Sequence, residues 1–122
     1  MLKQFAIALT GAAMIAGAAL AHAPAVGKHG GQQTDAGNFH VEAVVKGNTL
    51  DVFVTDHGET PVSTKGFKGT AVLIANGKPV QIKLAPRGEN ILTGTSPVAL
   101  STPIKGAIQI TDSDNQTVQA KF

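Results

Sequence analysis

The residues best suited to bind a ligand in this chain are its four histidines, and all of them lie in the N-terminal half: His22, His29, His40 and His57. The chain has no cysteine, and both of its methionines fall within the first 21 residues. A metal site elsewhere in the chain would therefore use nitrogen and oxygen ligands. Such ligands suit a divalent metal ion, Cu(II), Zn(II), Ni(II) or Co(II), and argue against a thiolate or thioether carrier of Cu(I).

Residues 1–21 have the three-part layout of a secretory signal peptide. A lysine near the start is followed by a run of small apolar side chains and then by two Ala-x-Ala sites. The run is short for a membrane-spanning helix, which needs about 20 apolar residues. We expect cleavage after Ala21, because cleavage after Ala23 would leave Pro24 at the new N-terminus. The alternative is a retained membrane anchor, but the pattern favours a periplasmic or secreted protein with no membrane span after signal removal.

The composition excludes several classes of function. The formal net charge is only +2 at pH 7, and Trp and Tyr are absent, so the chain lacks the basic patch and stacking rings of a nucleic-acid-binding protein. It has no G-x-S-x-G or H-E-x-x-H motif and no cysteine nucleophile, which argues against an enzyme. Asp112 and Asp114 match only part of a calcium loop, so we interpret them as a hairpin turn.

The segment 22–38 is rich in Gly, Ala and polar residues and has no clear period, so it is predicted to be a flexible leader. From residue 39 onward, short alternating runs are separated by turn residues, including Gly47-Asn48 and Asn76-Gly77. This spacing predicts an all-β, immunoglobulin-like sandwich of about seven strands over residues 39–122. The predicted strands are residues 39–45, 49–55, 69–75, 80–84, 90–95, 104–110 and 117–122.

The first two predicted strands can be aligned as a hairpin centred on Gly47-Asn48. His40 then faces Thr55, and one face of the hairpin is wholly apolar and should form the core. His40 lies on the opposite face, and His57 joins it as a diagonal neighbour if the second strand extends by two residues. Diagonal neighbours lie roughly 7–8 Å apart at Cα, so two imidazoles could reach one ion. A slip of one residue would instead place His40 opposite Asp56.

Other residues could complete such a site. His29 could fold back from the leader as a third ligand, and His22 could chelate Cu(II) through its amine and ring if it becomes the N-terminus. Asp56 or Glu42 could supply oxygen. The alternatives need no metal: the histidines could be solvated surface residues, and Asp56 could cap a turn.

Three segments in order resemble a family of small exported β-proteins found with heavy-metal resistance and efflux systems. They are residues 29–31 (HGG), 39–45 (FHVEAVV) and 55–66 (TDHGETPVSTKG), and the similarity continues through residues 69–92. Related segments occur in periplasmic adaptor subunits of metal-exporting pumps. The resemblance implies a metal-linked role and points to His29, His40 and His57; His22 is not part of the pattern.

Two functions remain as hypotheses. The first is a periplasmic metal-binding protein that acts as buffer, sensor or delivery partner of a heavy-metal efflux system. Its metal affinity should fall below about pH 6.5, because ligation needs neutral imidazoles. The second is a metal-free interaction domain that binds a pump subunit or another exported protein through an edge strand or a loop surface.

Overall fold

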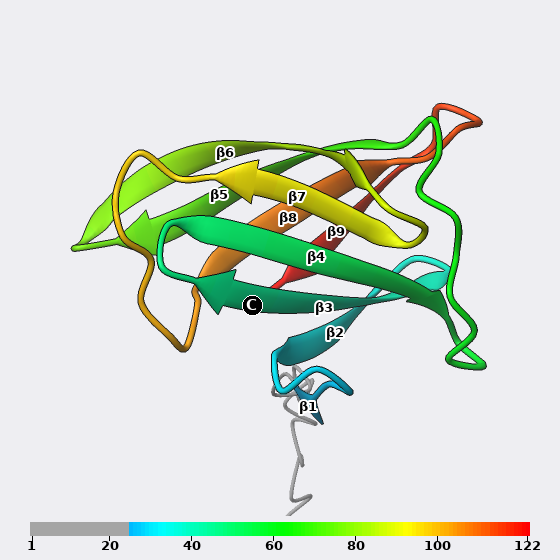
Figure 1. The fold of residues 1–122 in the computed structure, drawn as a ribbon, viewed down its shortest axis with the longest axis horizontal. Helices are drawn as coiled ribbons and strands as arrows, with labels where there is room; N and C mark the ends of the chain where they lie inside the picture. Colours follow the sequence, from blue (N-terminus) through cyan, green and yellow to red (C-terminus); the bar gives the residue numbers. More distant parts are fainter. Residues whose placement is uncertain (1–24) are drawn as a thin grey trace, which may run out of the picture.

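The computed structural model describes residues 25–122, which form only strands, turns and loops (Figure 1). None of these residues belongs to a helix that could cross a membrane. The predicted signal peptide, residues 1–21, and His22 lie outside the described residues. Nine strands form: β1 (Ala25–Val26), β2 (Gln32–Ala36), β3 (Phe39–Lys46), β4 (Thr49–Asp56), β5 (Lys68–Ala75), β6 (Lys78–Arg87), β7 (Ile91–Thr95), β8 (Gly106–Thr111) and β9 (Thr117–Lys121).

The nine strands make one antiparallel sheet in the order β1-β2-β3-β4-β7-β6-β5-β8-β9. The sheet curls, so that β2 and β9 approach each other although they are not paired. In Figure 1, β8 and β9 pass behind β3 and β4 at an angle. The first part of β6 pairs with β5 up to Leu84, and its end, from Ala85 to Arg87, pairs with β7 alone. Pro86 lies in the part of β6 that has a neighbouring strand on one side only, where proline is tolerated.

The curled sheet encloses a core of aliphatic side chains. From β3 onward, inward-facing residues alternate with outward-facing ones along the strands, which explains the period of two in the sequence. With few aromatic residues, the core relies on branched side chains, which pack well on a pleated sheet. Its largest fully buried members are Leu50, Leu73, Ile82, Leu92, Ile108 and Ile110.

The prediction of an all-β protein is confirmed. The seven predicted strands coincide, within a few residues at their ends, with β3 to β9. The structure has nine strands because residues 25–36, which we expected to belong to a flexible leader, form β1 and β2. The sequence of β2, QQTDA, has no apolar alternation, since only Ala36 enters the core. Hydrogen bonding to β3, rather than burial, holds it in place.

The register predicted for the first hairpin is also confirmed. His40 pairs with Thr55, Val41 with Val54 and Val45 with Leu50. The apolar set on one side is buried, and His40 lies on the outer side. At the turn, Gly47 has a φ of 61°, a left-handed conformation that glycine adopts without strain. The hairpin therefore presents His40 and Thr55, two residues before His57, on one outer surface.

Candidate metal centre

Three side chains that can ligate a metal meet on the outer face of the sheet at its β2–β4 end. Asp35 lies on β2, His40 on β3, and His57 directly after the last residue of β4. One ligand atom from each lies within 4.8 Å of those of the other two. The sheet register causes this proximity, because Asp35 pairs with His40, and His40 pairs with Thr55, two residues before His57.

The contacts within this group are direct. Nε2 of His40 lies 3.2 Å from Oδ1 of Asp35. The rings of His40 and His57 meet edge to face, with centroids 4.7 Å apart and planes at 78°. The His40 side chain is only 19% exposed, whereas that of Asp35 is 71% exposed. The group therefore has one partly buried imidazole at its base and two ligands at the surface, where an ion could reach them from solvent.

In the imidazoles of His40 and His57, one ring nitrogen has a polar partner outside the group of three side chains. Nε2 of His57 lies 3.1 Å from the carbonyl oxygen of Gly37, which can only accept a hydrogen bond, so Nε2 donates and Nδ1 keeps its lone pair. Nδ1 of His40 lies 3.4 Å from the side-chain nitrogen of Gln33, which donates to it, so the hydrogen of the neutral His40 ring lies on Nε2, toward Asp35. The two ends of an amide are interchangeable by rotation. Only with the Gln33 amide turned over, so that its oxygen accepts from Nδ1–H, would Nε2 of His40 be free to ligate beside Asp35.

His29 is not part of this group. Its Nδ1 lies 2.8 Å from Oε1 of Glu42, and its ring stacks on Phe53 with centroids 3.7 Å apart and planes at 12°. Oε2 of Glu42 accepts the backbone N–H groups of His29 and Gly31, each at 2.8 Å. Glu42 is only 4% exposed, so the contact of this carboxylate with the turn between β1 and β2 is shielded from water.

Asp56 does not join the group either. It pairs with Phe39 on the inward-facing side of β4. Its Oδ1 accepts the backbone N–H groups of Gly58 and Thr60, each at 2.9 Å. Asp56 thus caps the turn that follows β4, and the carboxylate that lies beside His40 is that of Asp35. His22, which the sequence also suggested as a ligand, lies outside the described residues.

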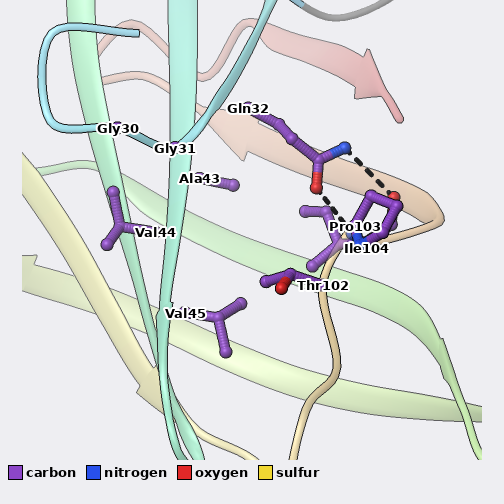
Figure 2. Close-up of a pocket in the computed structure, with 9 residues that line it drawn as sticks. All are labelled: Gly30, Gly31, Gln32, Ala43, Val44, Val45, Thr102, Pro103 and Ile104. Carbon is purple, nitrogen blue, oxygen red and sulfur yellow. Dashed lines mark hydrogen bonds between the residues drawn. The ribbon is translucent and has the colours of Figure 1, made fainter. Parts of the chain in front are cut away.

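A hollow at the other end of β3 offers no such chemistry. It is lined by residues of the β1–β2 turn, of β3 and of the loop before β8 (Figure 2). There Gln32 uses its side-chain amide like a strand backbone: Oε1 accepts the N–H of Ile104, and Nε2 donates to the carbonyl of the same residue. No histidine or charged side chain lines this hollow. The Gln32 side chain joins β2 to the loop, and this hollow offers no ligand for a metal ion.

Sequence reasoning missed Asp35, although a signal for it exists. Gly37-Asn38 is the same dipeptide as the Gly47-Asn48 turn, and it forms the turn between β2 and β3. A hairpin centred on it places Asp35 opposite His40. Comparison of the chain with models of protein families, with curated proteins and with solved structures finds no match.

Proposed function

We propose that this protein binds a divalent transition-metal ion through Asp35, His40 and His57. The observation that carries the proposal is the mutual approach of their ligand atoms to within 4.8 Å. Metal–nitrogen and metal–oxygen bonds of about 2.0–2.2 Å put the ligand atoms of a tetrahedral site about 3.3–3.6 Å apart, so the three side chains would have to draw together by up to about 1.5 Å around an ion. Asp35 takes the place that the sequence suggested for His29 or Asp56.

Two imidazoles and one carboxylate form a ligand set that suits Zn(II), Cu(II), Ni(II) or Co(II). Three protein ligands leave at least one coordination position for water or for a ligand from another molecule. The exposure of Asp35 and His57 would let an ion enter and leave without a large rearrangement. Both properties favour a buffer, sensor or delivery protein over a structural metal site, which is normally closed by four protein ligands.

The cellular role in this proposal rests on the sequence. The signal-like residues 1–21 favour export to the periplasm, and the resemblance to proteins found with heavy-metal resistance systems favours a pump component as partner. We also assign the curled sheet to the immunoglobulin-like sandwiches, because β6 passes from one half of the sheet to the other and the two halves enclose a single core.

Calorimetric titration with Zn(II), Cu(II) and Ni(II) tests the proposal. We expect a saturable high-affinity site that is lost in a His40→Gln, His57→Gln double variant. An Asp114→Asn variant is the matched control, because Asp114 is an exposed carboxylate in the β8–β9 turn. Unchanged metal affinity in the double variant would overturn the assignment of the site.

The second candidate function is a metal-free interaction domain. Its support is an apolar area on the outer side of β5, where Val72 and Ile74 are 44% and 48% exposed. Ile74 pairs with Pro79 on β6, and Val72 pairs with Ala107 on β8. Capture of a pump subunit that is equally efficient with chelator present, and that is lost in a Val72→Asp, Ile74→Asp variant, would favour this function over metal binding.

A further inference from the structure

The imidazole of His29 is held in one orientation by groups that the candidate metal centre does not use. A carboxylate oxygen can only accept a hydrogen bond, so the 2.8 Å contact with Oε1 of Glu42 places the hydrogen of the neutral ring on Nδ1. The stacked ring of Phe53 fixes the plane of the imidazole. Nε2 is then left with its lone pair, on a ring that is 43% exposed.

Metal-ligating histidines commonly donate their other ring N–H to a carboxylate, which orients the ring and strengthens it as a ligand. The contact between His29 and Glu42 is this arrangement, already assembled. We propose that Nε2 of His29 is the principal ligand of a second site for a divalent transition-metal ion, separate from Asp35, His40 and His57.

A pocket of about 450 Å³ lies beside the His29 ring. The turn after β4 contributes Glu59 to its lining, and the β1–β2 turn contributes Lys28. Glu42 lies at its base with both oxygens engaged by the turn. The two carboxylates outnumber the one ammonium group, so the lining favours a cation. Nε2 of His29 and the carboxylate of Glu59 would ligate the ion, and the pocket has room for water ligands.

The two sites are neighbours but do not share ligands. Gln33 and Thr55 line the pocket, and both flank His40, Gln33 through its amide contact and Thr55 through the sheet register. His29 is absent from the group of ligand atoms that meet around His40. The second site therefore does not depend on the first. With only two protein ligands, it should bind its metal ion more weakly than the site around His40 does.

Histidine NMR can test the second site in isolation. Replacing His22, His40 and His57 with Gln leaves His29 as the only histidine of the chain. Long-range ¹H–¹⁵N correlation spectra of this triple variant should show the Nδ1–H tautomer. Added Zn(II) should shift the Nε2 resonance in a saturable way. In the same background, Glu59→Gln should weaken Zn(II) binding about tenfold, and Asp114→Asn should leave it unchanged.

Two results would overturn the second site. One is an Nε2–H tautomer of His29 or an Nε2 resonance that does not respond to Zn(II) in the triple variant. The other comes from the reverse experiment, a His29→Gln variant with the other histidines intact. If it abolishes the stronger site as well, His29 is a ligand of that site and not of a separate one. Loss of only the weaker site supports the proposal, whether or not the site around His40 binds as proposed.

Discussion

The rings of His40 and His57 meet edge to face, with centroids 4.7 Å apart and planes at 78°. This contact joins the start of β3 to the turn after β4, and it occurs beside Asp35, 3.2 Å from His40. Histidine rings in van der Waals contact next to a carboxylate are an arrangement that a cation would stabilise.

The first prediction separates two neighbouring carboxylates. Asp35→Asn should lower metal affinity about tenfold or more, because it removes the one anionic ligand of the site. Asp56→Asn should leave metal affinity unchanged, since Asp56 uses Oδ1 to cap the turn. Asp56→Ala should instead lower the free energy of unfolding by about 1–2 kcal/mol, because two backbone N–H groups lose their acceptor. Calorimetry and chemical denaturation measure the two effects; the opposite pattern would make Asp56 the ligand.

Metal affinity should depend on pH. Protons compete with the metal for imidazole nitrogen, so affinity should decline as the pH falls from about 7.5 to about 5.5. Binding should release protons over the same range, and the number released can be measured by calorimetry in buffers of different ionisation enthalpy. An affinity that stays constant over this range would mean that carboxylates alone hold the ion.

The third prediction concerns Gly31, which directly precedes β2 and lies close to the backbone of β3. A Cβ added at Gly31 would lie 2.3 Å from the backbone carbonyl oxygen of Ala43, and backbone cannot move aside cheaply. Gly31→Ala should therefore destabilise the protein by about 1–3 kcal/mol and displace the start of β2. Gly58→Ala is the control, because its Cβ would meet only the side-chain oxygen of Asp56, at 3.3 Å.

Because β2 carries Asp35, we also expect Gly31→Ala to weaken metal binding, while Gly58→Ala binds like the unchanged protein. Normal metal affinity in a destabilised Gly31→Ala variant would show that the position of Asp35 does not depend on this end of the strand.

The sequence was sufficient to place His40 and His57 because His40 lies on β3 and His57 directly follows β4, and both strands have a strong apolar alternation. Their register follows from the requirement that Val41 and Val54 face inward together. No such requirement acts on β2. Its residues are polar, and a shift of its register would bury or expose little, so periodicity could not reveal it.

The position of His29 could not be predicted for a different reason. It depends on Glu42, a charged residue that the pattern assigned to the outer, solvated face. In the structure the β1–β2 turn folds over that carboxylate and covers it, leaving it 4% exposed. Three hydrogen bonds from the turn replace the lost water. Contacts of this kind depend on the path of a turn and leave no period in the sequence.

The last prediction concerns a second covered carboxylate on the same outer face. The side chain of Asp51 is 5% exposed. Nη2 of Arg87 donates to its Oδ2 at 2.8 Å, and Oγ1 of Thr93 donates to its Oδ1 at 2.7 Å. These contacts link β4, β7 and the end of β6. Arg87→Ala would leave a buried charge with one hydrogen bond fewer.

We expect Arg87→Ala to lower the free energy of unfolding by about 1–3 kcal/mol, measured by urea denaturation. An added Asp51→Asn change should recover part of the loss, since burying a neutral amide costs less than burying a charge. Lys83→Ala serves as the control, because Lys83 is exposed on β6 and forms no ion pair within residues 25–122. If Arg87→Ala and Lys83→Ala have equal effects, the ion pair contributes nothing to stability, and Thr93 with the surrounding packing suffices to hold Asp51.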